Sequence, residues 1–484
     1  MSETPTEPTT AREPLSAQSV IARLERIDVW SLSYLYIGII GLGFLFTFYD
    51  IFDINVSFIQ TCVALRPGCT PATALGDLRL PVVLNLVGYV IGTLVLSPLA
   101  DRLGRRNMLL ITMLITGLGS LYTALAPDYA NFVAGRIVTG IGIGADLAIV
   151  NTYINEVAPR RQRGRYTAII FTMSAVGAFV GIWLGLLLTT PKAPWPLGLP
   201  FALADKGFES GWRWMYAVGA LLALVAILLR IELPESPRWL VGQRRIRDAD
   251  GVVRRMEERA SRRGPLAAPI DVAEVVPTPP ERAPYSELLR SPRYLRRSVL
   301  LLATWFLAYI TVYAFSSGFT AVLTGLHYEP SEAGVITAVG TLGFIAQGLF
   351  TSVVVERLER RYWLPIGAVL TIVGAVLVAE GGTTLTTAFV GSALIFFGFN
   401  LWVSPTYALS AESFPTRIRT TGFAVVDGVG HLGGGVGILV LAPALPHLSV
   451  LGALLLICSF QVVAAVVVQF VPHTRNRPLD TVSP

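Results

Sequence analysis

The stretch Asp-Arg-Leu-Gly-Arg-Arg at residues 101–106 follows a long apolar run, and a related stretch, Glu-Arg-Leu-Glu-Arg-Arg at 356–361, follows another. The two stretches begin 255 residues apart (356 − 101). A second pattern, Glu-x-x-Pro-x-x-x-Arg, occurs at 156–163 and again at 412–419, an offset of 256 (412 − 156). Because both patterns keep nearly the same register across half the chain, the sequence predicts two copies of one structural unit.

The composition indicates that these units lie in a membrane. Apolar residues make up 53% of the chain and charged residues only 14%, against about 25% charged in an ordinary soluble domain. Mean hydropathy is +0.60. The apolar residues fall in runs near the length that crosses a bilayer as a helix. Twelve spans are predicted, at about 34–60, 81–100, 107–126, 130–156, 165–190, 212–233, 298–319, 333–355, 363–380, 385–411, 420–442 and 449–471.

Arginines gather in alternate loops, which sets orientation and explains the net charge of +6 without a nucleic-acid partner. The arginine-rich loops and the long central segment share one side, so both termini are predicted to be cytoplasmic. The sequence therefore divides into a cytoplasmic tail with a short amphipathic interfacial helix at 1–33, a six-helix bundle at 34–234, a cytoplasmic linker at 235–297, a second bundle at 298–471 and a tail at 472–484.

The three cysteines carry little chemistry. Cys62 and Cys69 flank a short loop that is predicted to face outside, where a disulfide can form. A disulfide and two free thiols are both compatible with that spacing. Cys458, inside the last apolar run, is expected to be a packing residue.

Three motifs carry a family resemblance. Residues 97–106 resemble the loop 2–3 signature of the major facilitator superfamily, with Ser97 where that pattern has Gly. Arg-x-x-x-Gly-x-Gly-x-Gly at 136–144 resembles its fourth-span signature. Pro-Glu-Ser-Pro-Arg-Trp-Leu at 234–240 resembles the signature that follows span 6 in the sugar-porter-like branch. The resemblance implies an all-α membrane protein of twelve transmembrane helices in two six-helix bundles, with a small-molecule substrate between them.

The repeated charged loops are candidates for gating. Ion pairs between them would hold the cytoplasmic face closed in one state and break in another. The alternative is that these charges only set orientation and cap helices. The gating candidates are Asp101, Arg102, Gly104, Arg105, Arg106, Glu156, Arg163, Glu356, Arg357, Arg360, Glu412 and Arg419.

Acidic residues inside apolar spans are candidates for proton coupling, because such residues are costly in a membrane and a shielded carboxylate can exchange protons. Asp146 is the first choice, followed by Asp50 and Asp53, which lie on one helix face at i, i+3. The spacing of Asp50 and Asp53 and the Gly-Ala-Asp ending at Asp146 resemble the phosphate:proton symporter branch, where matching aspartates serve coupling. The alternative is that an acid pairs permanently with Arg136 or His431.

The substrate site is predicted around Asp427 and His431, which share a helix face at i, i+4. Protonated His431 could bind an anion. The phosphate branch has Lys at this position, and sugar porters usually have glutamines in spans 5 and 7 that are missing here, so both substrates are disfavoured. The other substrate candidates are Arg136, Asn85, Tyr89, Tyr309, Tyr313, Gln347, Asn400 and Trp402, with packing or lipid contact as the alternative for each aromatic.

The sequence thus predicts a monomeric secondary transporter of the plasma membrane, working by alternating access and proton-coupled symport of an organic or aromatic acid. A sugar or phosphate symporter, a proton-antiport exporter and a transporter-derived nutrient sensor stay open as alternatives. No catalytic constellation or phosphate-binding loop is apparent, which argues against an enzyme and against direct ATP drive. No cofactor is expected beyond the proton gradient.

Overall fold

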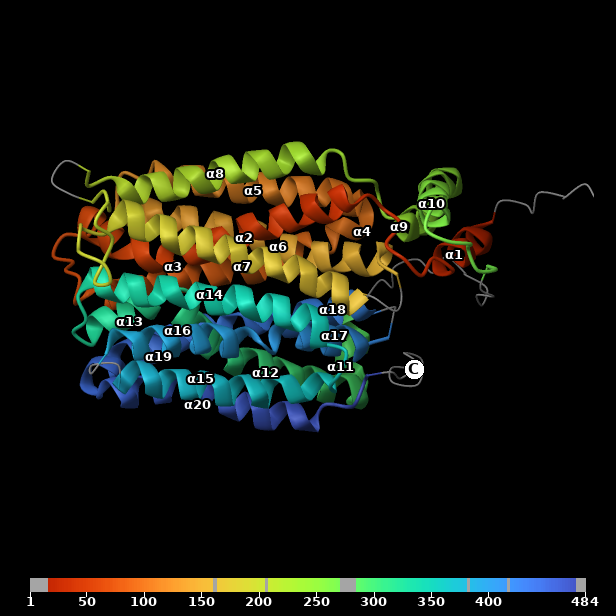
Figure 1. Ribbon diagram of the computed structural model, residues 1–484. Helices are drawn as coiled ribbons and strands as arrows, with labels where there is room; N and C mark the ends of the chain where they lie inside the picture. Colours follow the sequence, from red (N-terminus) through yellow and green to blue (C-terminus); the bar gives the residue numbers. More distant parts are fainter. Residues whose placement is uncertain are drawn as a thin grey trace, which may run out of the picture.

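The computed structural model describes residues 16–159, 163–204, 208–269, 284–380, 384–415 and 418–475. These residues form a long bundle of helices, with the first half of the chain in one layer and the second half in the layer below it (Figure 1). Twelve of the helices are long and apolar enough to cross a membrane, as the sequence predicted. The predicted fold class is therefore confirmed.

The first half places its helices in pairs around a shared interior. The first span runs to the middle of the disulfide loop, several residues beyond its predicted end. Contacts are most extensive between α2 and α7, between α5 and both α6 and α8, and between α3 and α6. The bounds are α2 (Tyr34–Leu65), α3 (Ala74–Ile91) continued by a π-helical turn (Gly92–Leu96), α4 (Leu99–Leu103), α5 (Arg105–Ala124), α6 (Tyr129–Val157), α7 (Arg163–Thr189) and α8 (Gly211–Arg230).

Three spans of the second half are interrupted. The seventh span ends at Ser316 and a short helix continues it, and the tenth breaks near Leu401, whose carbonyl cannot accept a helical bond from Pro405. The eleventh contains a π-helical turn before it restarts at Leu432. The bounds are α12 (Pro292–Ser316), α13 (Phe319–Gly325), α14 (Pro330–Val354), α15 (Trp363–Glu380), α16 (Leu385–Asn400), α17 (Val403–Glu412), α18 (Arg419–Phe423), the π turn (Ala424–Gly428), α19 (Leu432–Ala444) and α20 (Val450–Val467).

The two halves meet along buried side chains. Helix α7 packs against α14, and α19 packs against α3. Glycines make the close approach within the second half possible: a Cβ on Gly433 would lie 1.9 Å from the carbonyl oxygen of Phe306. The interface between the halves is therefore where residues of distant sequence come together.

A small helical module lies at one end, with α1 (Ala17–Glu25), α9 (Pro237–Gly242) and α10 (Ile246–Ser261) (Figure 1). Helix α1 forms where an interfacial helix was predicted, but its apolar residues are buried in protein and α1 packs against α10. Arg23 binds Asp250 at 2.6 Å and Glu257 at 2.5 Å. The apolar face of α1 is therefore covered by α10, and the position of this helix at the membrane interface stays a prediction.

The loop between α2 and α3 contains the disulfide that the cysteine spacing had left open. Cys62 and Cys69 are bonded to each other, and Cys458 is a buried free thiol. The bond closes the turn between α2 and α3.

Candidate functional site

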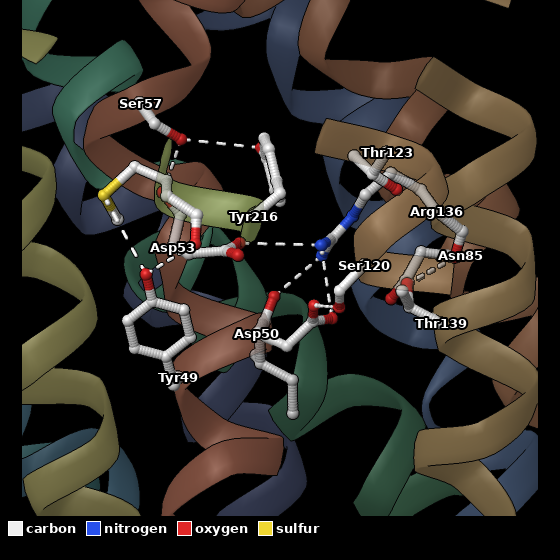
Figure 2. Close-up of polar contacts among 12 residues, drawn as sticks. Tyr49, Asp50, Asp53, Ser57, Asn85, Ser120, Thr123, Arg136, Thr139 and Tyr216 are labelled. Atoms are coloured by element: carbon white, nitrogen blue, oxygen red, sulfur yellow. Dashed lines mark hydrogen bonds and ion pairs between the residues drawn. The ribbon is translucent and has the colours of Figure 1, made fainter. Parts of the chain in front are cut away.

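Arg136 lies at the centre of a buried charge cluster in the first half (Figure 2). Its Nη1 is 3.2 Å from Asp50 Oδ2 and 3.5 Å from Asp53 Oδ1, and its Nη2 donates to the Asp50 carbonyl at 2.8 Å. Ser120 donates to the other Asp50 oxygen at 2.7 Å. Both aspartates are fully buried and Arg136 is 2% exposed. Helices α2, α5 and α6 thus bring two acids and one base together.

The charges of this cluster do not cancel. Two ionised carboxylates and one guanidinium leave a net charge of −1 in an interior where unpaired charge is costly. Asp50 has two partners for its side chain, whereas neither carboxylate oxygen of Asp53 has a hydrogen-bond partner among the described residues. Asp53 is therefore the group on which one added proton would neutralise the cluster.

Asp146 has a different environment from the one its sequence position suggested. Arg230 Nη1 lies 2.5 Å from Asp146 Oδ1 and Nη2 lies 3.0 Å from Oδ2, and Thr112 adds a hydrogen bond of 2.9 Å. Both charged side chains are buried, so the pair is closed and neutral. Arg230 was not among the predicted site residues, because an arginine that ends an apolar run looks like an ordinary orientation signal.

Asp427 and His431 form a second buried cluster, between the two halves. Tyr89 of the first half donates to Asp427 Oδ2 at 3.2 Å, and Tyr309 of the second half donates to Oδ1 at 3.0 Å. His431 Nδ1 lies 2.8 Å from the Asp427 carbonyl oxygen and 3.7 Å from Oδ1. The imidazole is held between the rings of Tyr89 and Tyr309, each with a centroid 3.9 Å away. Four predicted substrate residues are thus in mutual contact.

Further aromatic rings line this cluster. Trp305 packs against Tyr309 and Trp402, with centroids 5.1 Å and 5.0 Å away. Tyr407 packs against Trp305 at 5.1 Å and interacts with the Asp427 carboxylate. Tyr313 lies 5.9 Å from His431, ring to ring. Trp305 was missed, although its spacing of four residues before Tyr309 places both on one helix face.

The remaining polar candidates fall in two places. Asn85 Nδ2 donates to the Arg136 carbonyl at 2.7 Å, which links α3 to the charge cluster. Asn400 donates to Gln347 at 3.1 Å, and both line a narrow crevice between α7, α14 and the break after α16. Gln347 and Asn400 therefore lie in this crevice and not in the cluster around Asp427.

The repeated loop motifs form equivalent ion pairs in the two halves. Arg105 binds Glu156 at 3.0 Å, and Arg360 binds Glu412 at 3.5 Å and Glu356 at 3.0 Å. Gly104 has a φ of +97°, and a Cβ there would meet the Glu235 carboxylate at 2.3 Å. Each of these three pairs lies within one half, and gating stays a prediction. Of the other candidates, Arg106 binds Glu235 through its backbone N–H, Arg102 and Arg357 are exposed, and the side chains of Asp101, Arg163 and Arg419 lie outside the described residues.

With this geometry established, comparison with known proteins gives the family. The model of the family described as "Sugar (and other) transporter" matches residues 36–484. The chain belongs to the sugar (and other) transporter family. Its members and relatives are transporters, so the prediction that it is not an enzyme is confirmed.

Relatives within this family are named for several substrates. The chain is 26% identical to the niacin transporter NiaP of Acinetobacter baylyi over 86% of its length and 88% of the relative's. It is 26% identical to the 4-hydroxybenzoate transporter PcaK of the same organism, over 80% and 82%. It has the fold of the major facilitator proton:xylose symporter XylE, with a TM-score of 0.69, 19% identity, and coverage of 93% and 98%. The chain thus belongs to a family of membrane proteins that transport small molecules.

Proposed function

We propose that this transporter carries out proton-coupled symport of a small ring-containing organic metabolite across the plasma membrane, with both termini in the cytoplasm. The observation that carries the proposal is the sharing of Arg136 by Asp50 and Asp53. A net charge of −1 in a buried site creates a demand for one proton, and neither carboxylate oxygen of Asp53 has a hydrogen-bond partner among the described residues. The proton would bind there and be carried with the substrate.

The proton site and the substrate site are joined by one helix. Asn85 on α3 contacts the backbone of Arg136, and Tyr89, one helical turn further along α3, contacts Asp427 in the other half. A change at Arg136 therefore reaches a residue that bonds across the two halves. In alternating access the halves rock against each other, so the bond from Tyr89 to Asp427 has to break in each cycle.

Asp146 has a supporting role in this proposal. Its charge is already balanced by Arg230, and its carboxylate has three donors, so an added proton would break an established pair. A buried ion pair of this kind holds helices α6 and α8 in register. The sequence-based preference for Asp146 as the coupling acid is therefore replaced by a preference for Asp53.

The test is uptake of radiolabelled ring compounds, including nicotinate and 4-hydroxybenzoate, into proteoliposomes with and without an inward proton gradient. Uptake that requires the gradient in the wild type and loses that requirement in Asp53→Asn supports the proposal. Glu258→Gln, an exposed acid on α10, serves as the matched control. Uptake that ignores both the gradient and the Asp53 substitution would show facilitated transport instead.

A further inference from the structure

The cluster around Asp427 has a charge that bears on the substrate. Its carboxylate is 1% exposed and accepts hydrogen bonds from Tyr89 and Tyr309, which are donors suited to an anion. His431 is tied through Nδ1 to the Asp427 carbonyl, and its charge, when protonated, would be balanced by the same carboxylate 3.7 Å away. The cluster therefore carries a charge between −1 and zero.

The other buried cations of the spans are already paired. Arg136 is bound to two aspartates and Arg230 to one. A free carboxylate that entered the middle of the protein would meet Asp427, the negatively charged cluster around Arg136 and the neutral Asp146–Arg230 pair. The described residues of the interior offer no surplus positive charge to bind it. The same surroundings favour a ligand that carries a positive charge.

The shape of the site points in the same direction. Rings from both halves surround the carboxylate, and the imidazole of His431 occupies the space between Tyr89, on which it stacks, and Tyr309, to which it is tilted by 39°. The centroid distances of 3.9 Å on the two sides show that this space has the width of one flat ring. Aromatic faces carry negative electrostatic potential and attract organic cations, most strongly when water is excluded. Trp305, Trp402 and Tyr407 extend this surface.

We propose that the Asp427 cluster binds an aromatic cation: a flat ring that takes the place of the His431 imidazole between Tyr89 and Tyr309, with its positive charge against the Asp427 carboxylate. This inference rests on the proposed symport and narrows its substrate. It departs from the organic or aromatic acid expected from the sequence, because Asp427 supplies a negative charge where an acid would need a positive one.

The location of the two acid clusters fits symport of such a cation. The proton would bind at Asp53 in the first half, whereas the cation would bind at Asp427 in the second half. Since each positive charge has its own carboxylate, both can be bound at once, which symport requires. In an antiporter the two would compete for one acid.

The test uses three compounds that share one ring and differ in charge: benzyltrimethylammonium, benzyl alcohol and benzoate. Binding to the purified full-length protein is measured in detergent at pH 7 through tryptophan fluorescence, with Trp305 and Trp402 beside the site as reporters. We expect the cation to bind at least tenfold more tightly than benzoate, with the alcohol between them. Asp427→Asn should weaken binding of the cation at least tenfold and that of the alcohol less than threefold, and Glu258→Gln should change neither.

Tighter binding of benzoate than of the cation would overturn the inference, as would absence of measurable cation binding or an unchanged order in Asp427→Asn. If that variant does not elute as a folded monodisperse protein, the wild-type order decides alone. Trp402→Leu then gives a second check, with a larger loss expected for the cation than for the alcohol. Binding needs no gradient, so this outcome is independent of whether transport is coupled to protons.

Discussion

Replacing Asp53 by Asn tests the proton site most directly. The substitution keeps the size of the side chain and removes one negative charge, so the cluster with Asp50 and Arg136 changes from −1 to zero. That is the charge which the wild type reaches only after it binds a proton. The variant should therefore bind substrate and exchange it across the membrane, but a pH gradient should no longer drive accumulation.

The expected magnitude follows from the charge count. One proton per cycle converts each unit of pH difference into about 1.36 kcal/mol, or roughly a tenfold concentration ratio. A gradient of one unit, with the membrane potential clamped at zero by potassium and valinomycin, should thus give the wild type up to about tenfold accumulation. Asp53→Asn should level off near a ratio of one. A ratio near one hundred in the wild type would mean two protons.

The assay pairs this accumulation with counterflow, in which unlabelled substrate inside the vesicles drives entry of labelled substrate without a gradient. Retained counterflow with lost accumulation is the expected pattern for Asp53→Asn. Accumulation equal to that of the wild type would refute the assignment of the proton to Asp53. Loss of both activities in a protein with an unchanged melting temperature would also refute it, because the residue would then be needed for the movement itself.

Three further outcomes are expected. Tyr89→Phe removes the hydrogen bond to Asp427 across the halves. Because hydrogen bonds to charged groups contribute about 1.5–3 kcal/mol, a melting scan should show a lower melting temperature, and substrate exchange rates should change. Asp146→Leu should lower stability by roughly 3–5 kcal/mol because Arg230 is left buried and unpaired, and adding Arg230→Met should restore most of the loss. Burial acts to raise the pKa of Glu359, but hydrogen bonds from backbone N–H groups outweigh burial and the pKa is lowered. The stabilising effect of Glu359 on the C-terminal segment should therefore be complete above the ordinary pKa of a glutamate and lost as pH falls through the lowered pKa. Proteolysis should then cut that segment in the wild type only at low pH, and in Glu359→Gln at all pH values.

The sequence was sufficient to predict the architecture, because each membrane-spanning helix is determined by the residues within it. Length and apolarity determine a span, and the two repeats of the charged loop showed the duplication before any contact was known. The pairing of Arg105 with Glu156 and of Arg360 with Glu412 then followed the same register in both halves. The interruption near Leu401 was missed because Pro405 lies inside an otherwise continuous apolar run.

The pairing of the buried charges could not be predicted in the same way. Spacing placed Asp427 and His431 on one face, but which arginine faces which aspartate depends on how separate helices pack. Asp146 was ranked first as a coupling acid because its partner lies 84 residues away, at the end of another span. Arg136 was recognised as a possible partner, yet nothing in the sequence showed that two acids share it.

The sharing of Arg136 also shows that the buried acids differ in the balance of charge around them and not in their burial. Asp53, Asp146 and Asp427 are all buried to the same degree, so burial alone gives no ranking. Asp146 is matched by one cation, Asp53 shares one with another acid, and Asp427 is surrounded by hydroxyl donors and aromatic faces from both halves. An acid with its own cation holds helices together, an acid that shares one needs a proton, and an acid among aromatic rings needs a cationic ligand. If transport requires both a proton on Asp53 and a cationic ligand at Asp427, neither the proton nor the substrate alone allows the halves to move. Leak of either one across the membrane is then suppressed.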